Sequence, residues 1–166
     1  EYELDKNIGR GRIYRVEHDT TKRGPAPRML DETPAELVAH LSHPNGWWRS
    51  EAQKLIILHR DTSVVPALKS LATSGAEPLG RLHALWALEG LDAVDAKLLT
   101  HAMADGDARV RAAAVRIAEP LMVNDRTLDS AIHTLAGDAS ADVAIQVVLS
   151  VLHAGHPKAD AIVKTV

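Results

Sequence analysis

The stretch from Asp105 to Glu119 constrains the fold more than any other feature, because weaker copies of it occur on both sides. An aspartate at 105 or 107 suits the first position before a helix, where its side chain can accept a backbone N–H. Small or branched apolar residues then fall at relative positions 0, 3, 4 and 7, namely Val110, Ala113, Ala114 and Ile117. This spacing places them on one stripe of a helix. The stretch therefore predicts the second helix of a helical hairpin.

The copies are related by a regular spacing. Aligning the second helices superposes Arg49, Arg81, Arg111 and Ala144, which are 32, 30 and 33 residues apart. A single hairpin cannot bury its own apolar face, so repeated hairpins stack and share a core, with at least about three needed for stability. The spacing predicts an all-α superhelix of about four helical hairpins.

Turn and capping signals place the individual helices. Thr33, Pro34 and Glu36 form the strongest start signal, since they combine a capping residue, a first-turn proline and the acid of a capping box. Asn124 is the expected cap of the seventh helix, and Gly155 is the expected stop of the eighth. The predicted helices cover about 33–41, 47–59, 64–71, 78–89, 95–103, 107–119, 126–136, 142–153 and 158–166.

Residues 1–30 differ from the rest, and we divide the chain into an extended segment with a linker (1–30) and a helical repeat domain (31–166). Both tyrosines lie in the first part, where Arg12 to Glu17 is prone to form a strand. Thr20 to Arg28 is rich in proline and basic residues and is typical of a linker. Because the chain starts at Glu1, we expect it to be a piece of a longer protein.

Composition excludes several classes of function. The helical part is acidic, with 12 Lys/Arg against 17 Asp/Glu after residue 30, which argues against a nucleic-acid partner. The absence of cysteine excludes disulfides, cysteine-bound zinc, iron–sulfur clusters and covalently attached haem from this chain. No apolar run approaches the roughly 18 residues of a membrane span. We expect no cofactor, no membrane contact and a monomer.

Asp107-Ala-Arg-Val-Arg-Ala-Ala-Ala114 resembles the HEAT repeat, especially its short bacterial form, and this resemblance covers residues 33–155. It implies a right-handed HEAT-like solenoid. Two segments resemble something narrower, the helical region of large multidomain proteins of planctomycete-type bacteria. These segments are His43-Pro-Asn-Gly-Trp-Trp-Arg49 and Arg81-Leu-His-Ala-Leu-Trp-Ala-Leu-Glu-Gly-Leu91.

In that family a β-propeller resembling sugar dehydrogenases precedes the helices, and a c-type cytochrome module often follows them. The segment from Gly9 to Val16 is similar to the last propeller strand. The propeller body and any haem-binding cysteine are absent here, so the family's dehydrogenase activity does not transfer to this chain. The resemblance implies an exported protein, in which these helices are a spacer or a docking surface for other domains of the parent chain or for another protein.

The repeated arginines indicate a structural role. In HEAT-like repeats an arginine at this position commonly joins neighbouring hairpins through aspartates. We therefore expect a structural ladder of Arg49, Arg81 and Arg111, with Asp107 and its equivalents as acceptors. The alternative is a surface that holds an anion or an acidic partner. Ala144 departs from the pattern.

Trp48 and Trp86 lie on apolar stripes and are expected in the core, whereas Trp47 is turned about 100° away and can reach solvent. With Arg49, His83 and Arg109, Trp47 forms the candidate interaction surface. The histidine pairs at 40/43 and 153/156 have helical spacing, but each second histidine precedes proline, which disfavours a helical metal site. We predict no metal site and no catalytic residue.

We thus expect a non-catalytic scaffold or protein-interaction module within a larger redox protein. The alternative is a small-molecule-binding or enzymatic HEAT-like domain, of the lyase type, with a pocket between hairpins. That alternative predicts a deep cleft with converging polar groups and a titratable residue of shifted pKa. The paired His-Glu dipeptides typical of iron hydroxylases with this architecture do not occur.

Overall fold

The computed structural model describes residues 16, 18–22, 24 and 26–166. In this part of the chain all regular structure is helical, which confirms the predicted all-α class. The α-helices are α1 (Pro34–His40), α2 (Gly46–His59), α3 (Val65–Ser74), α4 (Pro78–Gly90), α5 (Ala96–Met103), α6 (Ala108–Ile117), α7 (Asp129–Leu135), α8 (Ala141–His153) and α9 (Ala159–Val163). Short 3-10 turns are η2 (Met29–Asp31), η3 (Thr62–Val64) and η4 (Arg126–Leu128).

Side-chain caps begin several helices where the sequence predicts them. Thr33 and Glu36 make the reciprocal capping box of α1, and Asp95 accepts the Leu98 N–H at 2.8 Å at the start of α5. The predicted cap at Asn124 is wrong. Asp125 caps this region instead, because the chain first forms the turn η4 and its carboxylate accepts the Thr127 N–H at 2.9 Å.

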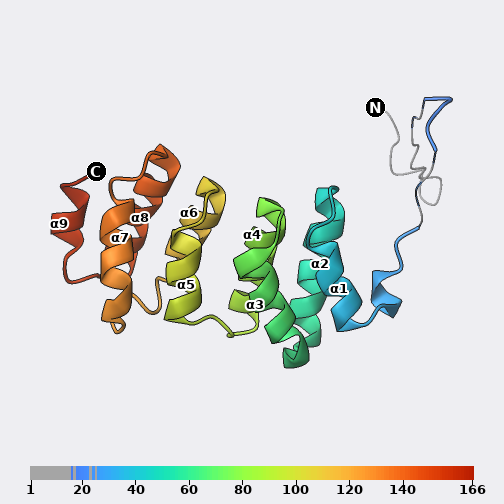
Figure 1. Ribbon diagram of the computed structural model, residues 1–166, viewed down its shortest axis with the longest axis horizontal. Helices are drawn as coiled ribbons and strands as arrows, with labels where there is room; N and C mark the ends of the chain where they lie inside the picture. The colour runs from blue at the N-terminus through green and yellow to red at the C-terminus, as the bar shows by residue number, and fades with distance from the viewer. Residues whose placement is uncertain (1–15, 17, 23, 25) are drawn as a thin grey trace, which may run out of the picture.

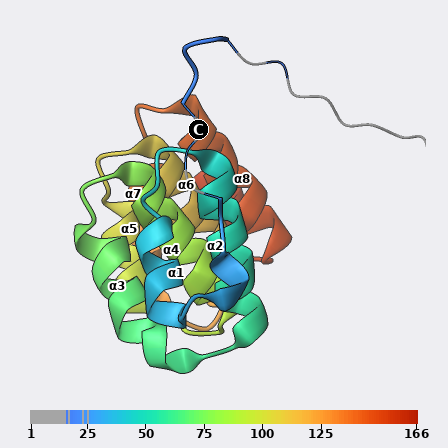
Figure 2. The ribbon, with the colours of Figure 1, turned by 90° about the vertical axis from the view of Figure 1, so that its right-hand side faces the viewer.

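The helices follow one another in chain order along the long axis, from α1 at one end to α9 at the other (Figure 1). Successive helices pair, α1 with α2, α3 with α4 and α5 with α6. Along the row, α2, α4, α6 and α8 pack against one another, and α1, α3, α5 and α7 do the same. Viewed along the row, the odd-numbered and even-numbered helices form two layers (Figure 2).

The core runs between the two layers and is built from leucine, alanine and valine. Val110, Ala114 and Ile117 of α6 are buried, as their spacing predicts, and Val115 joins them. Close approach depends on small residues: a Cβ on Gly80 would lie 2.5 Å from the Ser42 hydroxyl oxygen. Each helix therefore contributes a thin apolar face rather than a thick aromatic layer.

The two ends of the row differ. At the C-terminal end, Gly155 has a φ of 65° and ends α8, after which α9 packs on α8. At the N-terminal end, Met29 is buried in the core, although it precedes the predicted start of the helical domain. The predicted strand at 12–17 lies, except for Val16, outside the described residues.

Candidate functional site

The longest helix, α2, carries the most exposed aromatic side chain in the described chain. Asn45 caps it by accepting the Trp47 N–H at 2.9 Å, which fixes the direction in which the helix leaves the turn. Trp47 is 51% exposed and Leu58, near the other end of the helix, is 68% exposed. Large apolar side chains left in water are a feature of contact surfaces when they gather in one place.

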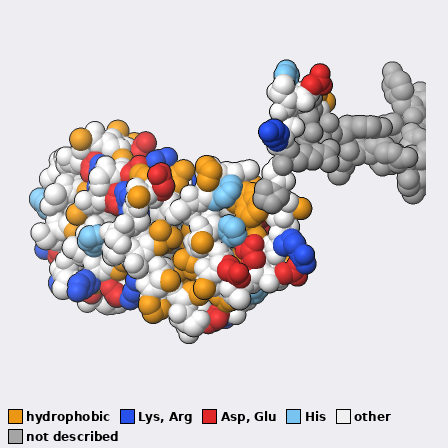
Figure 3. Space-filling model, turned by 45° about the vertical axis from the view of Figure 1, so that its right-hand side comes forward, with side chains coloured by type: hydrophobic (Ala, Val, Ile, Leu, Met, Phe, Trp, Pro, Cys, Tyr) orange, Lys and Arg blue, Asp and Glu red, His pale blue; other side chains and the backbone are white. Residues whose placement is uncertain are grey.

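A first hollow, which we call the η2 hollow, lies between α2 and the segment Pro27–Asp31 and has a volume of about 580 Å³. Trp47 and Leu58 line it from α2, and Leu30, 81% exposed, lines it from η2. Charged side chains line the rim of this hollow both from α2 and from the segment around η2. Figure 3 shows hydrophobic side chains gathered where the N-terminal segment meets the helical body, next to acidic and basic ones.

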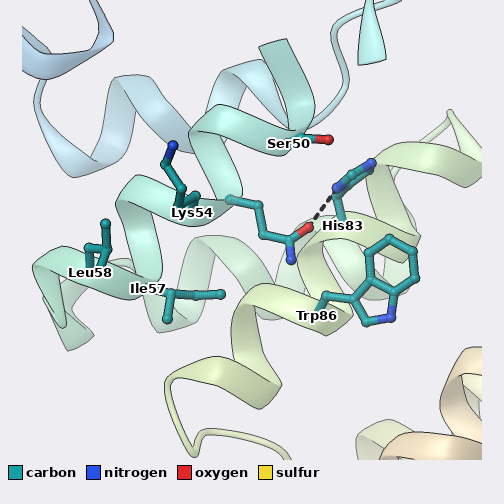
Figure 4. A pocket seen from close by; sticks show the side chains of 7 residues that line it. Ser50, Lys54, Ile57, Leu58, His83 and Trp86 are labelled. Carbon is teal, nitrogen blue, oxygen red and sulfur yellow. Dashed lines mark hydrogen bonds between the residues drawn. The ribbon is translucent and has the colours of Figure 1, made fainter. Parts of the chain in front are cut away.

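A second hollow, the α4 hollow, lies on the other side of α2, against α4, and measures about 430 Å³. Ile57 from α2 and His83 and Trp86 from α4 surround it (Figure 4). The two hollows share Lys54 and Leu58 as a common ridge. We call the two hollows and this ridge the α2 surface.

The polar groups of the α4 hollow are ordered by one hydrogen bond. The His83 Nδ1 atom and the Gln53 amide oxygen are 2.7 Å apart (Figure 4), so the imidazole donates from Nδ1 and its Nε2 atom is an acceptor. Burial, followed by the charge of Arg49, lowers the pKa of His83. The imidazole is therefore neutral at pH 7. The Trp86 ring meets it edge-on, with centroids 5.3 Å apart.

Arg81 and Arg111 form a ladder, but not with the acceptor that the sequence indicated, and Arg49, predicted as its third member, binds no aspartate. Arg81 donates from Nε and Nη2 to the two oxygens of Asp105, both at 2.7 Å. Arg111 holds Asp138 in the same way at 2.8 and 2.7 Å. The prediction of Asp107 as a ladder acceptor is wrong. Asp107 caps α6 and pairs with Arg109, because it lies beyond the turn position that faces α4.

The four residues predicted as an interaction surface do not form one cluster. Trp47 lines the η2 hollow and His83 the α4 hollow, on opposite sides of the ridge. Arg49 lies at the start of α2, where its Nη1 atom donates to the carbonyl oxygens of His43 and Pro44 at 2.6 and 2.9 Å. Arg109 lies on α6, outside both hollows, with its side chain 60% exposed.

Sequence reasoning missed most of the residues around these hollows. Leu58 and Lys54 follow Trp47 on α2, and an exposed leucine near a helix end was an available signal. Leu30 carried no such signal, because it belongs to a turn that the linker composition concealed. Gln53 became relevant only through its contact with His83, 30 residues later.

Trp48 and Trp86 are partly buried and pack against the core, as their positions predict. His40 and His43 both lie against Trp48, with ring centroids 5.0 Å from it. Within the described ranges, no three histidine or acidic side chains lie close enough together to hold a metal ion. The same part of the chain contains no helix with the length and apolarity needed to cross a membrane.

The geometry of the α2 surface thus has two hollows, each with a tryptophan, on either side of one lysine and one leucine. Comparison with protein-family models, with curated proteins and with solved structures finds no match to this chain.

Proposed function

We propose that this chain is a non-catalytic protein-interaction module, built as a right-handed HEAT-like solenoid of about four hairpins. The two helical layers and the repeated arginine position support this arrangement. The resemblance noted in the sequence supplies the setting, a larger exported redox protein. In that setting the partner is another domain of the parent chain or a separate protein.

The observation that carries the proposal is the α2 surface. Trp47 and Leu58 are each more than half exposed, and they lie on the same helix beside hollows that a partner's side chains could fill. Tryptophan is enriched among the residues that dominate binding energy, particularly where neighbouring groups exclude water. Lys54 lies on the ridge between the hollows, and its ammonium group forms an ion pair with Glu51 at 2.5 Å. A partner on this surface would therefore contact a charged group between two apolar hollows.

A calorimetric titration tests this proposal. The chain is titrated with separately produced propeller-type and cytochrome-type modules of the parent family. We expect heat from one of them, and we expect Trp47→Ala to weaken that binding by about 30-fold, the loss typical of a hot spot of about 2 kcal/mol. Leu149→Ser, which changes a residue 57% exposed on α8, is the matched control and leaves binding unchanged. No heat from either module would count against the proposal.

A second candidate function, a small-molecule binder, is favoured by the α4 hollow. Polar groups of Gln53 and His83 converge there beside the Trp86 ring, and the pKa of His83 is lowered by burial. Such a combination is typical of ligand sites. Saturation-transfer NMR with indole-type aromatic acids tests it: a signal that disappears in His83→Phe supports this function, and its absence with the whole panel argues against it.

A further inference from the structure

One position of the arginine ladder lacks its acid. Arg49, Arg81 and Arg111 each donate from Nη1 to the carbonyl oxygen of the residue six positions earlier, at 2.6, 2.7 and 2.8 Å. The three guanidinium groups are therefore held in the same way by their own turns. Arg81 and Arg111 use their remaining edge, Nε and Nη2, to bind an aspartate from the next hairpin.

Arg49 has no such aspartate. Asp105 and Asp138 precede their own ladder positions, 111 and 144, by six residues, and the residue six positions before Arg81 is Gly75. Glycine has no carboxylate to offer. The Nε atom of Arg49 is accordingly buried without a hydrogen-bond partner, and its Nη2 atom donates in no hydrogen bond within the described residues. A buried donor of a charged group is costly to leave unpaired.

The chain cannot supply the acid at position 75. A Cβ atom built there would lie 2.6 Å from the backbone oxygen of Leu71 and 2.7 Å from its Cδ1 atom. Any aspartate side chain would begin inside this contact. The missing acceptor therefore has to come from outside the turn.

Arg49 also differs from the other two arginines in the residue three positions before it. Gly46 begins α2, and the residues at the same repeat position in the next two hairpins are Pro78 and Ala108. A Cβ on Gly46 would lie 3.3 Å from Nη2 of Arg49, which is tight. Because Nη2 of Arg81 and of Arg111 binds an aspartate beside Pro78 and Ala108, the residue at this position does not close the edge of the guanidinium group.

We propose that the Nε and Nη2 edge of Arg49 is a binding site for a carboxylate, supplied by a ligand in place of the missing aspartate. A carboxylate matches the two parallel N–H groups of this edge, as Asp105 and Asp138 do at the other two arginines. Nη2 and Nε each donate to one of its two oxygens, as in the Arg81–Asp105 pair. This site does not depend on the proposed partner surface.

NMR of the arginine Nε–Hε groups tests the site on the whole chain. Sodium acetate is added up to about 0.1 M, against sodium chloride at equal ionic strength, so that general screening is matched. The Arg49 resonance is expected to shift saturably with acetate only. The resonances of Arg81 and Arg111, whose edges are filled, are internal controls and stay in place. Equal shifts of all three, or no shift at Arg49, would overturn the proposal.

One variant sharpens the test. Asp105→Gly removes the acid at the next ladder position and puts there the residue that stands at 75, so Arg81 should begin to respond to acetate. If Asp105→Gly fails to fold, the comparison of the three arginines in the unchanged chain still decides. A folded Asp105→Gly variant in which Arg81 gives no response to acetate would contradict the proposal.

The source of the carboxylate is distinguished by a second probe. N-acetyl-aspartate N-methylamide carries the same group on a peptide backbone, whereas acetate is a free small acid. Tighter binding of the capped aspartate at Arg49 indicates an acidic residue of another protein, and equal binding indicates a small acid. Both results support a carboxylate site, and failure of both probes removes it.

Discussion

Two arginine–aspartate ion pairs join α4 and α6 to the turns that precede α6 and α8, and the fold nearly encloses both. The side chains of Arg81 and Asp105 are 15% and 9% exposed, and those of Arg111 and Asp138 are 17% and 8% exposed. Their hydrogen bonds lower the pKa of Asp138 and, against the desolvation that acts on it, that of Asp105. Removing one partner leaves the other charge enclosed and unpaired, which costs more than the pair itself contributes.

We therefore expect Asp105→Ala to lower the free energy of unfolding by about 2–4 kcal/mol. Arg109→Ala is the matched control, because its pair with Asp107 leaves the arginine 60% exposed, and its cost is less than about 1 kcal/mol. Urea unfolding monitored by circular dichroism measures both. Equal losses in the two variants would show that enclosure of the first pair adds nothing to its effect.

Asp129, near the C-terminal end of the chain, makes a pH-dependent contribution to the free energy of unfolding. A hydrogen bond from Lys158, with a further one from His156, lowers its pKa from 3.8 to about 2. The unfolded chain binds this proton more readily, so the stabilisation is complete above about pH 4 and is lost as the pH falls towards 2. Unfolding of the wild type and of Asp129→Asn is compared at several pH values. Their difference in stability should shrink over this window, and a constant difference would contradict the assignment.

The three tryptophans differ in exposure, and fluorescence quenching can rank them. Variants that keep only one tryptophan are titrated with acrylamide. Trp47, 51% exposed, should quench most readily, while Trp48 and Trp86 are protected by their packing against the core. Equal protection of all three would remove Trp47 from the α2 surface.

The arginine pairs show where residue-level prediction stops. The repeated arginines identify a ladder, but Asp105 and Asp107 stand two residues apart in the same turn, and both can act as caps. Only the packing of two hairpins decides which carboxylate reaches back to Arg81. The missing acid at Gly75 is likewise visible in the sequence only after the acceptor position is known from the other two pairs.

At the scale of elements, helix starts are predictable because caps are local. Thr33, Pro34 and Glu36 act within one turn, and the structure places their capping box where the sequence does. The seventh helix is harder, since Asn124 and Asp125 are both good caps. The choice depends on the turn η4, which buries Leu128 completely and so reflects contacts made elsewhere in the chain.

Gly155, which ends α8, is predicted to contribute to stability through its backbone conformation. Gly155 has a φ of 65°, a region that favours glycine, so Gly155→Ala should destabilise the chain by about 1 kcal/mol. Gly106→Ala is the control, because Gly106 has no positive φ and a Cβ there would meet no atom within 4 Å. Thermal unfolding of both variants measures the difference. A neutral Gly155→Ala would show that α8 does not need this turn.

At the scale of the molecule, the η2 hollow could not be predicted. It joins Trp47, which the sequence places where it can reach solvent, to Leu30, which follows the predicted linker and precedes the first predicted helix. Their proximity follows from Met29, whose burial in the core anchors the turn beside α2. The repeated pattern predicts which side chains pack between successive helices. It cannot predict how a segment outside the repeat, such as η2, packs on α2.

The main helix contacts join neighbours along the row, so disturbance at one end should fade with distance. Leu37 of α1 is fully buried, and Leu37→Ala should cost about 2–5 kcal/mol. We expect hydrogen exchange to accelerate most in α1 and α2 and least in α8. Leu135→Ala, a matched truncation in α7, should give the reverse gradient. Uniform acceleration in both variants would mean that the helices unfold as one cooperative unit and that the row is not divided into separately stable hairpins.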